Sequence, residues 1–268
     1  MSRIMLADHF VKQKNLVLLW AWPVSQRKGS MLLQTSRKST GRHSTKNMNT
    51  LEFKPFPKMA RLRRDCIITE KIDGTNASIY IAKLPNDHPI PAHSLGVFDV
   101  GGEIHYMAAG SRTRWITPEN DNFGFAAWVA RNFIQLQELG EGHHFGEWWG
   151  SGIQRGYGFK NGERFFSLFN ATRWVEHDKP TAPISSDNPK APPVFQEHAP
   201  ACCKVVPVLY DGLFSTFIAE CELEILGAKG SVAAPKYMNP EGIVVYHKAA
   251  ATGFKMTIKD DDKPKGQA

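Results

Sequence analysis

The segment 71–76 reads Lys-Ile-Asp-Gly-Thr-Asn and combines a lysine with a tight-turn glycine, a pairing suited to covalent phosphate chemistry. A lysine at the end of a strand, backed by an apolar run, can lose part of its hydration. A neutral lysine amine is a nucleophile, and its flexible stem can reach a phosphorus atom. Gly74 allows the backbone to turn close to a bound nucleotide. Taken alone, the segment is better explained as an exposed hairpin with a surface lysine.

Two later segments each place a single carboxylate within an apolar strand. Glu147 lies in residues 145–150, and Glu241 lies at the start of residues 241–245. An unpaired charge is costly in such surroundings, so a metal ion, a ribose hydroxyl or a lysine would be its partner. Residues 253–259 then supply cations suited to an anionic phosphate. Each segment by itself also fits a strand with one outward-facing charge.

In this order the segments resemble the motifs of the covalent nucleotidyltransferases, the family of RNA ligases, DNA ligases and mRNA capping enzymes. The resemblance covers about residues 64–262. The matches are motif I at Lys71-x-Asp73-Gly74, motif III at 145–150, motif IIIa at 164–170, motif IV at 241–244 and motif V from Lys255 onward. Residues 111–114 (Ser-Arg-Thr-Arg) lie where the family carries a Ser-Arg element between motifs I and III.

The resemblance implies a role for each matched residue. Lys71 would attack the α-phosphate of ATP, expel pyrophosphate and retain AMP as a phosphoramidate. Asn76 matches a residue that assists the final joining step in nick-sealing RNA ligases. The other implied roles are adenine contact for Glu70, phosphate or ribose contact for Arg112, ribose binding for Glu147, adenine stacking for Phe166, metal placement for Glu241 and α-phosphate neutralisation for Lys255.

Two positions depart from the family pattern or leave a choice. Motif V usually reads Lys-x-Lys, but Thr257 occupies the second position and the next lysine is Lys259, on the same expected sheet face as Lys255. Motif IIIa offers Phe165, Phe166 and Phe169 as stacking rings, and the register favours Phe166.

The implied activity is ATP-dependent RNA ligation, which joins 3′-hydroxyl and 5′-phosphate ends through Lys–AMP and an adenylated 5′ end. Mg²⁺ or Mn²⁺ would accompany ATP, and the partner would be RNA ends or a nicked duplex, with no membrane partner. Only nine residues follow Lys259, too few for the OB-fold domain typical of DNA ligases and capping enzymes. A minimal DNA nick ligase and an inactive nucleic-acid-binding protein of the same fold remain the alternatives.

The elements expected to position these residues are mostly strands. We expect a strand–turn–strand hairpin at 64–82, a strand at 144–149, a second hairpin at 157–174 and strands at 242–246 and 253–258. Helical spacing predicts helices at 123–139 and 209–226, and six prolines predict a loop at 177–200. The expected fold is α+β, a nucleotidyltransferase (ATP-grasp-like) domain of antiparallel sheets with flanking helices and no OB-fold domain.

Composition divides the chain of 268 residues into an extension and a neutral domain. Residues 1–48 hold nine of the 33 basic residues and one of the 26 acidic residues, so the remainder is close to neutral despite the net charge of +7. We expect a basic extension at 1–48 that is either disordered or spurious, the RNA ligase adenylyltransferase domain at 49–262 and a tail at 263–268. The longest apolar run, residues 16–22, is too short to span a bilayer. Four cysteines without metal-type spacing favour a reducing compartment and a cytoplasmic location.

Overall fold

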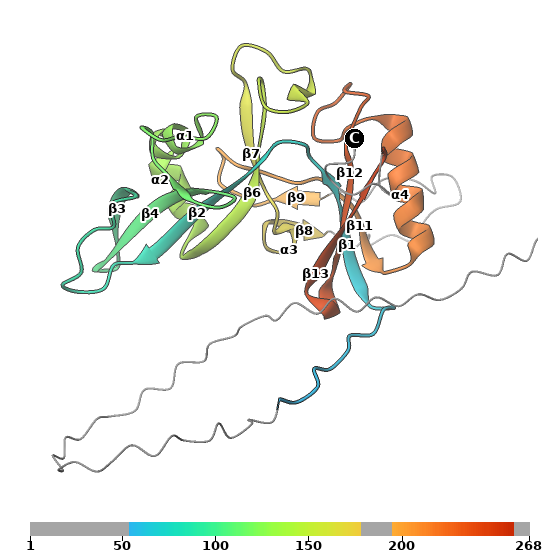
Figure 1. Cartoon of the computed structure of the whole chain (residues 1–268), viewed down its shortest axis with the longest axis horizontal. Coiled ribbons are helices and arrows are strands. Elements are labelled where there is room, and N and C mark those ends of the chain that lie inside the picture. Colours follow the sequence, from blue (N-terminus) through green and yellow to red (C-terminus); the bar gives the residue numbers. More distant parts are fainter. Residues whose placement is uncertain (1–53, 178–194, 260–268) are drawn as a thin grey trace, which may run out of the picture. The chain divides into compact units, whose positions relative to one another are not determined.

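The computed structural model describes residues 54–177 and 195–259, shown in colour in Figure 1. The chain divides into residues 1–55 and 56–268, and the fold described below belongs to the second unit. The expected extension at 1–48 and tail at 263–268 lie outside the described residues. None of the described helices is long and apolar enough to cross a membrane.

The first sheet is antiparallel, with strand order β11-β1-β12-β13. Its strands are β1 (Asp65–Lys71), β11 (Val208–Leu213), β12 (Gly242–His247) and β13 (Thr252–Thr257). Helix α4 (Thr216–Lys229) packs Ala219 and Leu226 against Cys66 and Ile68 of β1. Because side chains alternate along a strand, Ile67, Thr69 and Lys71 face the other side of this sheet.

The second sheet has the order β10-β7-β6-β2-β4-β3, with β5 paired to β4. Its strands are β2 (Thr75–Lys83), β3 (Ser94–Val100), β4 (Glu103–Ser111), β5 (Trp115–Ile116), β6 (Gly142–Gly150), β7 (Arg164–Leu168) and β10 (Lys204–Val205). All neighbours are antiparallel except β10 and β7. One face is covered by α1 (Phe125–Arg131), α2 (Phe133–Leu136) and the 3-10 helix η1 (Gln137–Leu139).

Short elements complete the described chain. They are the 3-10 helices η2 (Gly156–Gly158) and η3 (Lys248–Ala250), helix α3 (Ala171–Trp174) and the pair β8 (Val175–His177) and β9 (Phe195–Glu197). The expected α+β class is confirmed, and the described strands form no five-stranded barrel of the OB type. The strands expected at 144–149, 242–246 and 253–258 are confirmed as β6, β12 and β13.

The hairpin expected at 64–82 is wrong in its pairing. Both strands and the turn are present, but β1 joins the first sheet and β2 joins the second. Strand β1 pairs on both edges, with β11 and β12, and so has no edge left for β2. Gly74 is needed for the close crossing over β6, because a Cβ there would lie 2.5 Å from the carbonyl oxygen of Trp148. Lys71 therefore ends one sheet just before the next one begins.

The hairpin expected at 157–174 also has a different partner. Asn161 and Gly162 have the positive φ angles of the predicted turn, 56° and 80°. The segment before them is the 3-10 helix η2, and β7 pairs with β6 instead.

Two helix predictions and the loop prediction need adjustment. The helix expected at 123–139 is present but is interrupted at Asn132, and it ends at Gly140 with a φ of 69°. The helix expected at 209–226 is wrong in its first part, since 208–213 forms β11 and α4 starts at Thr216. In the loop expected at 177–200, residues 195–197 form β9, and 178–194 lie outside the described residues.

Candidate active site

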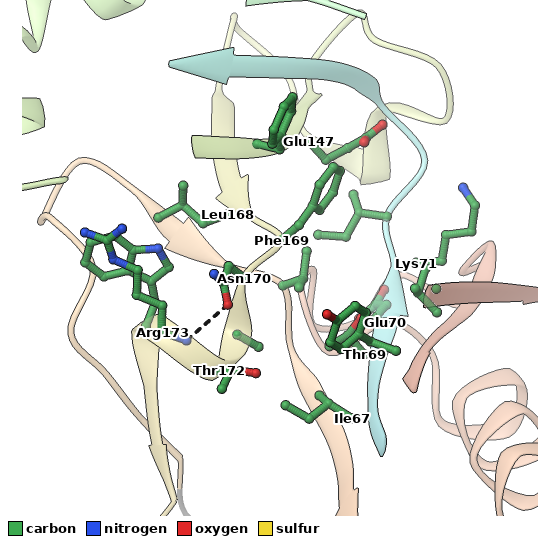
Figure 2. Close-up of a pocket in the computed structure, with 18 of the residues that line it drawn as sticks. Ile67, Thr69, Glu70, Lys71, Glu147, Leu168, Phe169, Asn170, Thr172 and Arg173 are labelled. Atoms are coloured by element: carbon green, nitrogen blue, oxygen red, sulfur yellow. Dashed lines mark hydrogen bonds between the residues drawn. The ribbon is translucent and has the colours of Figure 1, made fainter. Parts of the chain in front are cut away.

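A cleft of about 1000 Å³ is lined by strands of both sheets. The first sheet contributes β1, β12 and β13, and the second contributes β2, β6 and the end of β7, followed by α3. Figure 2 shows Lys71 on one side of the cleft and Arg173 on the opposite side. A cleft of this size fits a nucleotide-sized ligand.

Lys71 is the last residue of β1 and points to the cleft side of the first sheet. Its Nζ donates a hydrogen bond to Oε2 of Glu241 at 2.6 Å, and the two side chains are 24% and 18% exposed. Glu241 directly precedes β12, which pairs with β1 so that Lys71 lies opposite Gly242. The register of these two strands therefore fixes the amine beside its carboxylate.

The connection from Lys71 to β2 is held by two residues that the sequence did not single out. Nε of Arg155 donates to Oδ2 of Asp73 at 2.9 Å, and Nη1 donates to the carbonyl of Asn239 at 3.1 Å. The backbone N–H of Asp73 donates to the Tyr157 hydroxyl at 2.8 Å. Burial raises the pKa of Tyr157, which keeps its hydroxyl neutral. These contacts fasten the connection to the chain just before Glu241.

Glu147 faces Asn76 across the β6–β2 pair, close to Lys71. Its Oε1 accepts from the N–H of Gly74 at 3.0 Å, and its Oε2 accepts from Nδ2 of Asn76 at 3.1 Å. Burial raises the pKa of Glu147 to about 7, opposed by the hydrogen bond from Asn76 and by the charge of Lys71. The carboxylate lines the cleft and can still accept hydrogen bonds from a ligand hydroxyl.

Glu70 lies beside Lys71 in sequence, but its side chain leaves on the opposite face of β1. Oε1 accepts from the Ser231 hydroxyl at 2.6 Å, and Oε2 accepts from the N–H groups of Val232 and Ala233 at 2.8 and 2.9 Å. The side chain is fully buried, and burial raises its pKa against these hydrogen bonds. Glu70 lines the cleft, but both of its carboxylate oxygens accept hydrogen bonds from the loop after α4. An adenine contact through this carboxylate is not available in this arrangement.

The structure does not bring Phe166 to the cleft. Its ring is 0% exposed and packs against Phe125 and Trp128, with ring centroids 5.0 and 5.9 Å away. The reason is register, because Phe166 pairs with Trp148, whose side chain belongs to the core under α1. Phe169 is the ring of this segment that lines the cleft, and it is 42% exposed. The stacking interpretation therefore moves from Phe166 to Phe169.

The remaining expected residues divide into two groups. Lys255 lies on β13 opposite Val244, and both line the cleft. Arg112 is exposed just after β4 and does not line it. Lys259 also lies outside the lining, and its Nζ donates to Oδ1 of Asn239 at 3.4 Å. The structure thus gathers Lys71, Asn76, Glu147, Glu241 and Lys255, but not Arg112, Phe166 or Lys259.

Further cleft residues were not recognised from the sequence. Arg173 lies over the Trp174 ring at 4.6 Å and donates to the carbonyl of Leu139. Lys248 donates to Oδ1 of Asp211 at 2.7 Å. Neither residue lies in one of the motifs. Their positive charge near a proposed phosphate site is the feature that could have identified them.

The described residues contain no group of three or more His, Cys, Asp or Glu side chains arranged to hold a metal ion. The Oε2 atom of Glu241 can bind a metal ion only after its ion pair with Lys71 breaks. This donor set fits Mg²⁺ carried by substrate phosphates and water, which needs only one or two protein carboxylates. It does not fit a metal bound by the protein alone.

The RNA ligase family model matches residues 64–259, so the chain belongs to the RNA ligase family. Among solved structures, a variant of the Naegleria gruberi RNA ligase with AMP and manganese is 18% identical, with a TM-score of 0.42, covering 73% of this chain and 50% of that one. Another variant, with ATP and manganese, is 21% identical, with a TM-score of 0.41, covering 74% and 51%. The chain therefore spans about half the length of these structures. Comparison with curated proteins gave no match.

Proposed function

We propose that this chain is an ATP-dependent RNA ligase that joins 3′-hydroxyl and 5′-phosphate ends. The observation that carries the proposal is the Lys71 amine, held 2.6 Å from Glu241 at the edge of a nucleotide-sized cleft. Nζ attacks the α-phosphorus of ATP, a P–N bond forms, and the bond to pyrophosphate breaks. AMP then passes from Lys71 to a 5′-phosphate. Attack by a 3′-hydroxyl finally releases AMP and forms the phosphodiester.

Four side chains assist Lys71 in the first step. Glu241 Oε2 holds the Lys71 Nζ in position, 2.6 Å away, until ATP binds. Glu147 accepts hydrogen bonds from the ribose hydroxyls, and Phe169 stacks on adenine. Lys255 offsets the charge of the α-phosphate.

A divalent metal would enter with ATP. Mg²⁺ or Mn²⁺ bound to the phosphates, with Glu241 as a protein ligand, would spread the charge of the departing pyrophosphate. Asn76 orients groups for the final joining step, as the motif resemblance implies. We assign residues 49–262 as the adenylyltransferase domain, 1–48 as a basic extension and 263–268 as a tail. The four cysteines are free, which supports a cytoplasmic location.

Covalent labelling with α-labelled ATP and Mg²⁺ tests the proposed first step. The wild-type chain should become labelled, whereas Lys71→Ala and Lys71→Arg should not, because arginine stays protonated and cannot attack. Lys83→Ala removes a lysine from the far end of β2 and serves as the control, with wild-type labelling expected. Label on Lys71→Arg above background would place the nucleophile elsewhere.

Sealing assays, together with covalent labelling, distinguish an RNA ligase from the two alternative functions. An RNA ligase should seal a nicked all-RNA duplex or join RNA ends faster than it seals a nicked all-DNA duplex. Fastest sealing of all-DNA would favour a minimal DNA nick ligase. A wild-type chain that binds nucleic acid but never takes up label would be a binding protein without turnover.

A further inference from the structure

The open face of the second sheet carries aromatic rings that the nucleotide site does not use. Along β2, Ile79 and Ile81 are buried in the core under α1, so Ser78 and Tyr80 face the other way. Trp115 of β5 packs against Tyr80 on this open face, with ring centroids 5.6 Å apart. A contiguous group of rings at a protein surface is typical of an interaction site.

Four of these rings form a continuous stack, here named the ring row (His93, Trp115, His143 and Phe145). His93 and Trp115 are 4.8 Å apart and parallel within 3°. Trp115 and His143 are 5.8 Å apart at 26°, and His143 and Phe145 are 4.0 Å apart at 33°. Trp115 lies between two stacked rings of the row, whereas Phe145, at the inner end, is 54% exposed and offers aromatic surface to a ligand.

The ring row begins inside the cleft and leads away from it. His143 and Phe145 line the cleft, and Phe145 lies on the same face of β6 as Glu147. Trp115 lies farther out, where β5 pairs with β4. A chain-like ligand whose end reaches Lys71 could therefore continue along the ring row.

Cationic groups lie beside the outer end of the ring row. Arg112 and Arg114 directly precede Trp115 in the turn after β4. The Arg114 guanidinium donates to the backbone carbonyls of Trp115 and Asn120, which holds the turn. Arg112 is exposed and forms no ion pair with another residue in the described part of the chain. It can therefore bind a phosphate next to Trp115.

We propose that the ring row and Arg112 bind an unpaired RNA strand whose end enters the cleft. A base stacks on Phe145, since every base has an aromatic face, and a phosphate pairs with Arg112. A duplex cannot bind in this way, because its bases are already stacked on each other. The proposal depends on the proposed function only for naming RNA as the strand.

Binding of a labelled RNA of about 12 nucleotides, without ATP, tests the proposal by fluorescence anisotropy. Phe145→Ala should weaken binding of the unpaired strand about tenfold, and Phe145→Tyr should restore most of it. Arg112→Gln should lower the affinity and reduce the salt dependence by about the contribution of one phosphate contact. Phe217→Ala removes a ring that is 70% exposed on α4 and is the matched control, with unchanged affinity expected.

Two results would overturn the proposal. One is wild-type affinity in both Phe145→Ala and Arg112→Gln. The other is equal affinity of the wild-type chain for the unpaired strand and for its blunt duplex. Thermal melts of each variant show whether it is folded, and Phe145→Tyr and Arg112→Gln keep the test valid if Phe145→Ala is unstable. Because no ATP is present, failed covalent labelling would refute the ligase proposal without changing this result.

Discussion

At the scale of single residues, Glu147 links the stability of the fold to pH. Its pKa in the folded chain is about 7, above the ordinary value of 4.5, because burial disfavours the carboxylate. The folded state therefore binds a proton more readily than the unfolded state between these pH values. The stability that this group contributes is highest below pH 4.5 and falls as the pH rises through about 7.

The substitution Glu147→Gln should remove this dependence of folding stability on pH. From pH 5 to pH 8, the free energy of unfolding of the wild type should fall by up to about 3 kcal/mol relative to the variant. Chemical denaturation of both proteins at each pH measures the difference. Glu163→Gln, at an exposed position, should instead follow the wild-type curve. Parallel pH curves for Glu147→Gln and wild type would show that burial does not perturb this carboxylate.

Phe166 and Phe169 should respond to truncation in opposite ways. Phe166→Ala empties part of the core and should lower the free energy of unfolding by about 3–5 kcal/mol. Phe169→Ala removes an exposed cleft ring, so it should change stability little but raise the KM for ATP about tenfold in Lys–AMP formation. Thermal or chemical unfolding and labelling kinetics measure the two effects. An unchanged KM in Phe169→Ala would leave adenine without this stacking partner.

At the scale of elements, the connection between β1 and β2 sets the position of Lys71. Arg155 ties this connection to the backbone before Glu241, through the contacts to Asp73 and Asn239. Arg155→Ala should slow Lys–AMP formation about tenfold through kcat, with little change in the KM for ATP, because the ligand is not touched. Arg155→Lys, which can keep the ion pair, should recover part of the rate. A change in KM alone would contradict a positioning role.

Local patterns identified most strands but not their partners. An aromatic-rich run marked β6, and short β-type runs marked β12 and β13. The Asp73-Gly74 signal marked a turn correctly, but no local pattern could show that β1 pairs with β11 and β12 instead of β2. The apolar run that begins with Val208 fits either a strand or a helix, and only its place beside β1 decides in favour of β11.

The site residues that lie in sequence motifs could be predicted, and the others could not. Lys71 and Glu147 stand in motifs that resemble the family pattern in residue type and in order along the chain. Three phenylalanines within five residues could not be told apart, because which one is buried depends on α1. Arg155 acts through backbone carbonyls and one carboxylate brought together by folding, so no spacing in the sequence marks it.

At the scale of the whole molecule, the strands and the cleft are built from residues after the basic extension. Residues 54–64 are exposed, and the first sheet begins at Asp65. Deleting residues 1–47 should therefore leave the thermal melt and the Lys–AMP labelling nearly unchanged. RNA affinity should fall and become less dependent on salt, because eight net positive charges are removed. Loss of the cooperative melt would show that the extension is part of the folded domain.

The strand order of the first sheet has a consequence for synthesis on the ribosome. Strand β1 is made early, but both of its neighbours come from residue 208 onward. Until then its apolar residues and both hydrogen-bonding edges lack their native partners, a state prone to aggregation. A nascent chain released early would carry Lys71 without Glu241 or Lys255. Such a product would expose β1 to other chains and would lack the groups that make its lysine reactive.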